Sequence, residues 1–164
     1  MKTATVTSKD KEIVMTREFD APRDLVWEVW NDPKHVQNWW GPRGFTTRVK
    51  HVDLRVGGTW SYVMVAENGA EHPVNGKILE LVPPEKIVTT DEFGEEYAEL
   101  MPGIDLPKGL VTTAFFEDLG KRTRLTITIS HATVEDRIKH EGLGVAEGWG
   151  SSLDKLDEYL MEIQ

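Results

Sequence analysis

The segment GWGSSLDKLDEYLMEI, residues 148–163, lies just before the last residue of the chain, and its apolar side chains recur at alternating spacings of four and three residues. This spacing places them on one face of an α-helix, opposite a face of charged side chains. The apolar stripe consists of Trp149, Leu153, Leu156, Leu160 and Ile163. A helix with one apolar face has to bury it against another element. We therefore predict a long C-terminal helix, over about residues 144–163, packed on a sheet.

Alternating apolar and polar residues predict seven strands upstream of that helix. In residues 59–66, for example, Trp60, Tyr62 and Met64 share one face, which is the period of a β-strand. Asn68-Gly69 follows as a strong signal for a hairpin turn. The expected strands span residues 12–19, 48–54, 59–66, 71–81, 86–92, 110–118 and 122–131. The short connections between most of them favour antiparallel pairing.

Two short helices are expected after the first strand. Pro22 suits the first position of a helix, and Asp20 or Asp24 lies near its positive end. Asn31-Asp32-Pro33 ends this helix, and a second one follows to about residue 39. The fold class is therefore α+β, with a curved antiparallel sheet wrapped around the long C-terminal helix.

The composition narrows the classes of protein that remain. We expect a flexible leader over residues 1–10 and one domain over residues 11–164. The net charge of -9, from 28 acidic and 19 basic residues, argues against binding nucleic acid or an anionic membrane. The absence of cysteine excludes disulfides and a cysteine nucleophile. With no secretory signal or membrane span in the sequence, we expect a cytoplasmic protein.

Five short segments follow one another in an order that points to a known group of proteins. They are FDAP (19–22) with VW (26–27), WWGP (39–42), VDLRVGG (52–58), ILELVPPE (78–85) and EGW (147–149). Together they resemble the SRPBCC superfamily, also called START-like or helix-grip. Within it, they are similar to the family of heat-shock-protein-90 ATPase activator homologues. The resemblance covers about residues 11–163.

This resemblance implies a helix-grip fold with a deep pocket between the sheet and the C-terminal helix. It implies less about activity, because the eukaryotic activators use two domains and this chain is similar only to the C-terminal one. Stand-alone members of the family resemble binders of small apolar molecules. A homodimer and a chaperone partner are both compatible with the resemblance.

The aromatic residues are the best candidates for a binding pocket. The sequence leaves open whether they fill a dry core or wall a cavity. If they wall a cavity, histidines on the strands would act as polar handles for a ligand. The full set of candidate ligand-binding residues is Trp40, Trp60, Tyr62, Met64, His72, Phe93, Phe115, His131, Trp149 and Leu153.

Known catalytic, metal and cofactor motifs give no specific signal. The five histidines lack the His-Glu-x-x-His spacing of a zinc site, and no Gly-x-Ser-x-Gly elbow occurs. We therefore assign no catalytic residue, no metal and no cofactor. An inward-facing His72 or His131 would be the best candidate for a general acid or base.

Two further features carry expectations of their own. Residues 94–108 combine an acidic run with apolar residues, and form either a lid over the pocket or a patch for a partner subunit. Gly148 and Gly150 weaken the last helix, and close approach of that helix to the sheet would explain them. On that reading, Gly148→Leu would destabilise the protein.

Three functions remain in view. The first is non-catalytic binding of a small hydrophobic molecule in the pocket. The second is a co-chaperone or protein-interaction module that uses the acidic surface and residues 94–108. The third is a cyclase or hydrolase that uses an inward His or Glu as base. We favour the first, and the sequence alone does not decide whether the chain is an enzyme.

Overall fold

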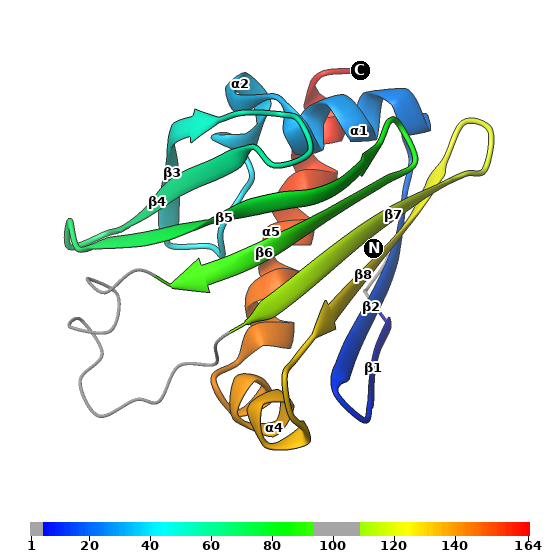
Figure 1. Cartoon of the computed structure of the whole chain (residues 1–164). Helices are drawn as coiled ribbons and strands as arrows, with labels where there is room; N and C mark the ends of the chain where they lie inside the picture. The colour runs from blue at the N-terminus through cyan, green and yellow to red at the C-terminus, as the bar shows by residue number, and fades with distance from the viewer. Residues whose placement is uncertain (1–4, 94–108) are drawn as a thin grey trace.

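A computed structural model describes residues 5–93 and 109–164, and Figure 1 shows the arrangement of their elements. The strands are β1 (Thr5–Lys9), β2 (Glu12–Phe19), β3 (Phe45–Val52), β4 (Thr59–Ala66), β5 (Glu71–Val82), β6 (Lys86–Phe93), β7 (Leu110–Asp118) and β8 (Thr123–Ser130). The helices are α1 (Arg23–Asn31), α2 (Pro33–Val36), α4 (Val134–Gly142) and α5 (Val145–Glu162).

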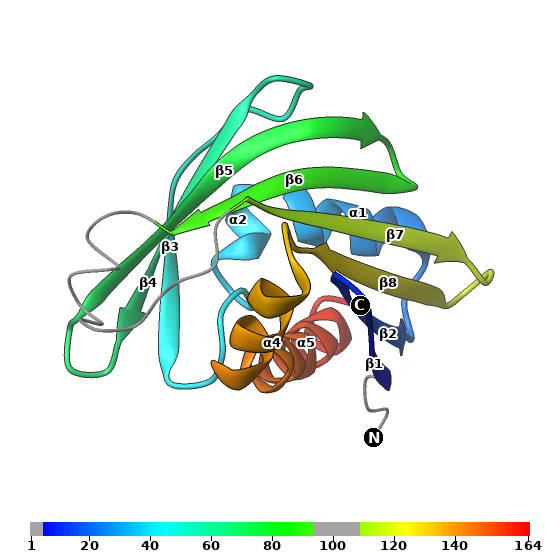
Figure 2. The same cartoon turned by 60° about the horizontal axis from the view of Figure 1, so that its bottom comes forward.

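The strands form one antiparallel sheet in the order β1-β2-β8-β7-β6-β5-β4-β3. From β3 to β8 each strand pairs with the next one along the chain. β2 instead pairs with β8, where Met15 lies opposite Ile127. The sheet arches over α5, with α1 and α2 against one end of the arch (Figures 1 and 2). The predicted α+β fold, a curved sheet around a C-terminal helix, is confirmed.

The core lies between the concave face of the sheet and α5. The inward residues Ile13, Met15 and Phe19 of β2 are fully buried, as are Leu156 and Leu160 of α5. Burial of each such side chain stabilises the fold by about 1.5–3 kcal/mol. The apolar stripe predicted from the sequence is therefore the face that holds α5 to the sheet.

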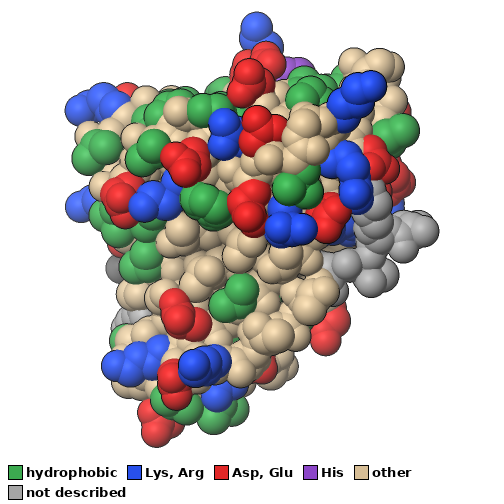
Figure 3. All heavy atoms as spheres, turned by 90° about the vertical axis from the view of Figure 1, so that its right-hand side faces the viewer, with side chains coloured by type: hydrophobic (Ala, Val, Ile, Leu, Met, Phe, Trp, Pro, Cys, Tyr) green, Lys and Arg blue, Asp and Glu red, His purple; other side chains and the backbone are tan. Residues whose placement is uncertain are grey.

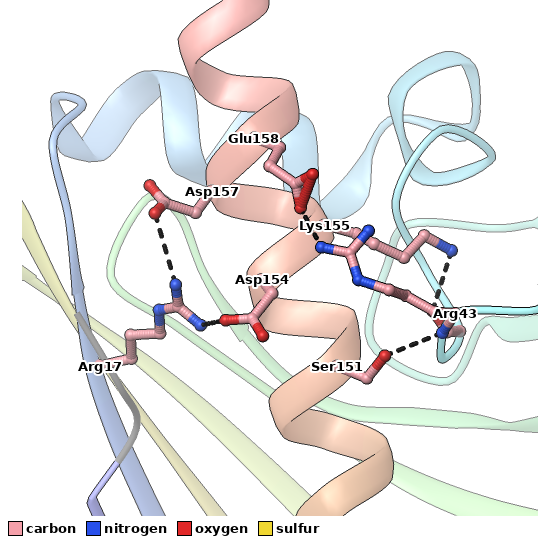
Figure 4. Close-up of polar contacts among 8 residues, drawn as sticks. Arg17, Arg43, Ser151, Asp154, Lys155, Asp157 and Glu158 are labelled. Carbon is pink, nitrogen blue, oxygen red and sulfur yellow. Dashed lines mark hydrogen bonds and ion pairs between the residues drawn. The ribbon is translucent and has the colours of Figure 1, made fainter. Parts of the chain in front are cut away.

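Polar contacts also hold α5 from two sides (Figure 4). On one side Arg17 of β2, only 3% exposed, forms ion pairs with Asp154 and Asp157. Arg17 shares the inward face of its strand with apolar residues, so the two carboxylates compensate a cation that would otherwise be buried alone.

On the other side, the segment between α2 and β3 contacts α5. The backbone N–H of Arg43 donates to Ser151 Oγ at 2.8 Å, and its guanidinium pairs with Glu158. Lys155 Nζ donates to the carbonyl oxygen of Gly41 at 3.0 Å. These contacts and those of Arg17 together form what we call the helix clamp.

Two elements of the structure, β1 and α4, differ from what the sequence predicted. Residues 5–9 were expected in a flexible leader, but they form the exposed edge strand β1, in which Val6 lies opposite Met15. Asp10, whose φ is 52°, turns the chain between β1 and β2. The helix α4 was not predicted, although the Thr133 side chain caps it by accepting from the N–H of Asp136.

The outer surface carries charges of both signs. On the face drawn in Figure 3, acidic and basic side chains are intermixed rather than gathered by sign. Arg122 pairs with Glu18 and Asp20, and Arg124 pairs with Glu117. Within residues 5–93 and 109–164, no helix is long and apolar enough to cross a membrane.

Candidate functional site

A cavity lies between the sheet and the N-terminal part of α5. Its larger chamber has a volume of about 400 Å³, and a smaller chamber has about 70 Å³. Trp40, Trp60, Asp91 and Trp149 line both chambers, so the two are neighbours that share a wall. A volume of this order suits a small organic molecule. The sequence left open whether the aromatic residues fill a core or wall a cavity, and several of them line these two chambers.

Aromatic rings form most of the shared wall. Trp40, which follows α2, packs at 73° to Tyr62 and at 81° to Trp149, with centroids 5.1 and 6.5 Å away. Trp60 and Tyr62 lie side by side on β4 with centroids 4.9 Å apart. Trp30 of α1 stacks on Trp149 at 5.9 Å. Such edge-to-face and stacked pairs are favourable beyond their buried area, so the rings hold one another in place.

The strand period explains why these rings face inward. Trp60 and Tyr62 of β4 are 7% and 9% exposed, and Met64, the next residue on the same face, lines the larger chamber. The indole N–H of Trp60 is buried beside Gly76 and has no acceptor among the described residues. Trp60 thus offers the cavity ring surface rather than a hydrogen bond.

Asp91 is the acidic residue of the cavity wall. Ile87, Thr89 and Asp91 alternate along β6 and all line the smaller chamber. The Thr112 hydroxyl donates to Asp91 Oδ2 at 2.6 Å, and the Thr89 hydroxyl to Oδ1 at 3.4 Å. Burial raises the pKa of Asp91 from 3.8 to about 6, against these two hydrogen bonds, which lower it. Burial, and then the charge of Asp91, also raise the pKa of Tyr62.

A pair of histidines lies at another part of the larger chamber. His140 of α4 is 7% exposed and lines the chamber, and its Nδ1 lies 2.9 Å from Nε2 of His131. His131 Nδ1 lies 2.8 Å from the carbonyl oxygen of Lys11. A carbonyl only accepts, so His131 Nδ1 carries a proton, and in the neutral pair His140 Nδ1 donates to His131 Nε2. Nε2 of His140 is then a hydrogen-bond acceptor.

The charge state of His140 follows from its burial. Burial, and then the nearby His131, lower the pKa of His140 from 6.5 to about 4. At neutral pH His140 is therefore uncharged, whereas Asp91 is mostly ionised. The two groups give the wall of the larger chamber one anionic acceptor and one neutral acceptor.

The N-terminal part of α5 borders empty space. Gly144, at φ 84°, precedes the helix, and Val145, Gly148 and Trp149 line the larger chamber. A Cβ atom built on Gly148 or on Gly150 meets nothing within 4 Å. The prediction that these glycines allow close packing of the helix on the sheet is wrong, because the space beside them is unfilled.

The structure places five of the predicted residues in the larger chamber. Trp40, Trp60, Met64, His72 and Trp149 line it, and Tyr62 lines the smaller one. The ring of His72 lies edge-on to Phe45, 5.6 Å away.

Three other predicted residues lie elsewhere. Leu153 belongs to the packed core, and His131 lies behind His140. Phe115 was expected to close the pocket, but it lies on the opposite face of β7 from Thr112, Ala114 and Phe116, so that prediction is wrong. Phe93 ends β6, and its side chain lies outside the described residues, as does the whole segment 94–108.

Sequence reasoning missed Asp91 and His140. Asp91 follows the inward positions 87 and 89 at the strand period, which was the available signal. His140 gave no such signal in the sequence, because the helix α4 that carries it was not predicted. Among the residues that the structure describes, one group has metal-ligand geometry: Glu28, Asp32 and His35 have oxygen and nitrogen atoms within 4.8 Å of one another. Asp32 caps α2, and His35 Nδ1 contacts the Tyr159 hydroxyl at 2.7 Å, so both already have structural partners.

Comparison with known proteins identifies the family. The family model described as Activator of Hsp90 ATPase homolog 1-like protein matches residues 20–161. The chain belongs to this family, as its sequence resemblance indicated. No functionally curated protein matches the chain.

Several solved structures share the fold and part of the sequence. A protein from Arthrobacter aurescens is 26% identical with a TM-score of 0.87, over 96% of this chain and 91% of that one. A protein from Chromobacterium violaceum is 30% identical with a TM-score of 0.76, over 92% and 96%. The AHSA1 protein from Silicibacter pomeroyi is 25% identical with a TM-score of 0.72, over 93% and 99%.

Proposed function

We propose that this protein binds a small, largely hydrophobic molecule in the cavity without turning it over. The observation that carries the proposal is the chamber of about 400 Å³ beside the N-terminal part of α5. Most of its lining is apolar or aromatic, with a few polar groups at fixed places, which is the usual make-up of a small-molecule site. Gly148 of α5 lines this chamber and contributes no side chain that would fill it.

The helix clamp supports a cavity that exists before the ligand arrives. Arg17 and the segment around Arg43 hold α5 by its charged residues, while Leu156 and Leu160 hold it by apolar contact. With the helix fixed in this way, the site loses little conformational freedom on binding. Such pre-organisation favours affinity.

Native mass spectrometry of freshly purified protein tests the proposal. A reproducible excess mass that is released on denaturation would support it and would identify the ligand class by extraction. The same measurement on Gly148→Leu, which adds a bulky side chain at a residue that lines the chamber, should show no excess mass. A clean apo mass, together with no uptake of any hydrophobic probe, would contradict the proposal.

A second candidate function rests on the family description. The family is described by activation of the Hsp90 ATPase, and the match spans residues 20–161 of a chain that we interpret as one domain. Adding the full chain to an Hsp90 ATPase assay tests this function. An increase in hydrolysis that saturates with concentration would support it. A rate that stays constant while ligand binding persists would favour the first proposal.

A cytoplasmic location and a homodimer stay predictions from the sequence.

A further inference from the structure

The carboxylate of Asp91 lies at the cavity wall, where a negative charge is stabilised by a nearby cation. It lines both chambers, and its hydrogen-bond donors are the hydroxyls of Thr112 and Thr89. Among the described residues, no Lys, Arg or His forms an ion pair with it. Asp91 is half-buried at the chamber wall, and a charge that is partly removed from water is costly unless it is paired and hydrogen-bonded. The site therefore has room for a cation that the described part of the chain does not supply.

The surroundings of Asp91 also suit a cation. The smaller chamber, which Asp91 lines, is walled by Trp30, Trp40, Trp60, Tyr62 and Trp149. Trp40 is nearly perpendicular to both Tyr62 and Trp149, so the rings present faces and edges in several directions. Faces of Trp and Tyr attract cations, and cages of such rings are a known mode of ammonium recognition.

The same lining disfavours anionic ligands. Neither chamber is lined by a Lys or Arg among the described residues. A fatty acid or another carboxylate would meet the carboxylate of Asp91 with no compensating cation. A neutral alcohol would meet an acceptor, but it would leave the charge of Asp91 unpaired.

The two chambers suit two different parts of one ligand. The smaller chamber, about 70 Å³, has space for a compact polar group, and the larger one, about 400 Å³, for an apolar body. We infer that the ligand is a lipophilic amine whose ammonium group lies beside Asp91 within the aromatic rings and whose apolar body occupies the larger chamber. This inference rests on the proposed function and names its ligand class.

Three probes that differ mainly in charge test the inference. Naphthylethylamine, naphthylethanol and naphthylacetate share a ring system and carry a cation, a neutral donor and an anion. Isothermal titration calorimetry at neutral pH should show that the amine binds at least about tenfold more tightly than the alcohol, because ion pairing and cation–π contact add to burial. The acetate should bind most weakly.

Two matched variants assign the preference to Asp91. Asp91→Asn keeps the shape and an acceptor for Thr112, and should reduce the advantage of the amine to about twofold or less while the alcohol still binds. Glu92→Gln removes the same charge from the exposed adjacent position of β6, and should leave the advantage unchanged. If Asp91→Asn does not fold, Trp149→Leu should weaken the amine more than the alcohol.

The outcomes separate this inference from the proposed function. Equal binding of amine and alcohol by the unmodified protein would overturn the inference and leave the cavity as a binding site. A preference for the amine that survives in Asp91→Asn would overturn it too. If none of the three probes binds, the proposed function fails and the inference fails with it.

Discussion

The two halves of α5 meet the sheet in different ways. The C-terminal half, from Ser151 on, buries Leu153, Leu156 and Leu160 and is held from both sides by the helix clamp. The N-terminal half, Val145–Gly150, lies beside a chamber of about 400 Å³, which Gly148 lines, and a Cβ atom built on Gly148 or Gly150 meets nothing within 4 Å. The comparison teaches that tight packing at one end of a helix lets its other end border a cavity.

The largest expected effect is on the packed half. Leu156→Ala should lower the free energy of unfolding by about 2–5 kcal/mol, because it leaves a void in a fully buried core. Val145→Ala in the other half is the matched control, and should cost about 1 kcal/mol or less, since Val145 is half-buried and faces the chamber. Urea unfolding of both variants gives the comparison. Equal losses would mean that the two halves pack alike.

The buried arm of the helix clamp should matter more than the exposed arm. Arg17→Ala removes a buried cation and its packing, and should cost about 2–3 kcal/mol because Asp154 and Asp157 keep part of their hydration. Arg43→Ala breaks a pair whose side chains are both 58% exposed, and should cost less than about 1 kcal/mol. Thermal unfolding followed by circular dichroism measures both. A larger loss for Arg43→Ala would contradict the roles assigned to the two arms.

Two titratable residues that line the cavity, Asp91 and His140, should give the stability of the protein opposing pH dependences. Asp91, with its pKa raised to about 6, binds a proton more readily in the folded state, so it stabilises the protein as pH falls from 6 to 3.8. His140, with its pKa lowered to about 4, destabilises the protein as pH falls from 6.5 to 4. The two effects largely cancel across this window.

Removing one group should reveal the other. Relative to the unmodified protein, Asp91→Asn should lose roughly 2–3 kcal/mol of stability between pH 6.5 and 4, whereas His140→Gln should gain a similar amount. Denaturant unfolding at several pH values gives these differences. Parallel pH profiles for all three proteins would show that neither group is shielded by the cavity.

The smallest expected effect is a gain. Gly148→Ala should raise the free energy of unfolding by up to about 1 kcal/mol, because Ala favours the helix and its methyl group meets open space. Differential scanning calorimetry measures the change. A loss of stability would instead support the close contact between helix and sheet that the sequence suggested and the structure does not show.

The fold could be read from the sequence because its signals are local. The period of Trp60, Tyr62 and Met64 predicted β4, and the stripe from Trp149 to Leu160 predicted α5. The edge strand β1 was missed because its residues are all exposed and pair only through the backbone. Local patterns do not report such pairing.

The site was less accessible to sequence reasoning. The sequence gives no sign that charged residues of α5 such as Asp154 and Lys155 bind other elements, because their partners lie more than a hundred residues away along the chain. A period-two pattern also does not say which face is inward, and for that reason Phe115 was wrongly expected to face the pocket. The pairing of His131 with His140 depends on α4 and could not be anticipated.

The central claim, that the space beside the N-terminal half of α5 is a binding site, can be tested by titration with the neutral fluorescent probe phenylnaphthylamine. We predict saturable binding of the probe by the unmodified protein and the same binding by Glu147→Leu. Gly148→Leu should bind the probe about tenfold more weakly. Glu147 is exposed on the same turn, so it controls for added apolar surface. Equal uptake by all three proteins, or none by the unmodified one, would contradict the claim.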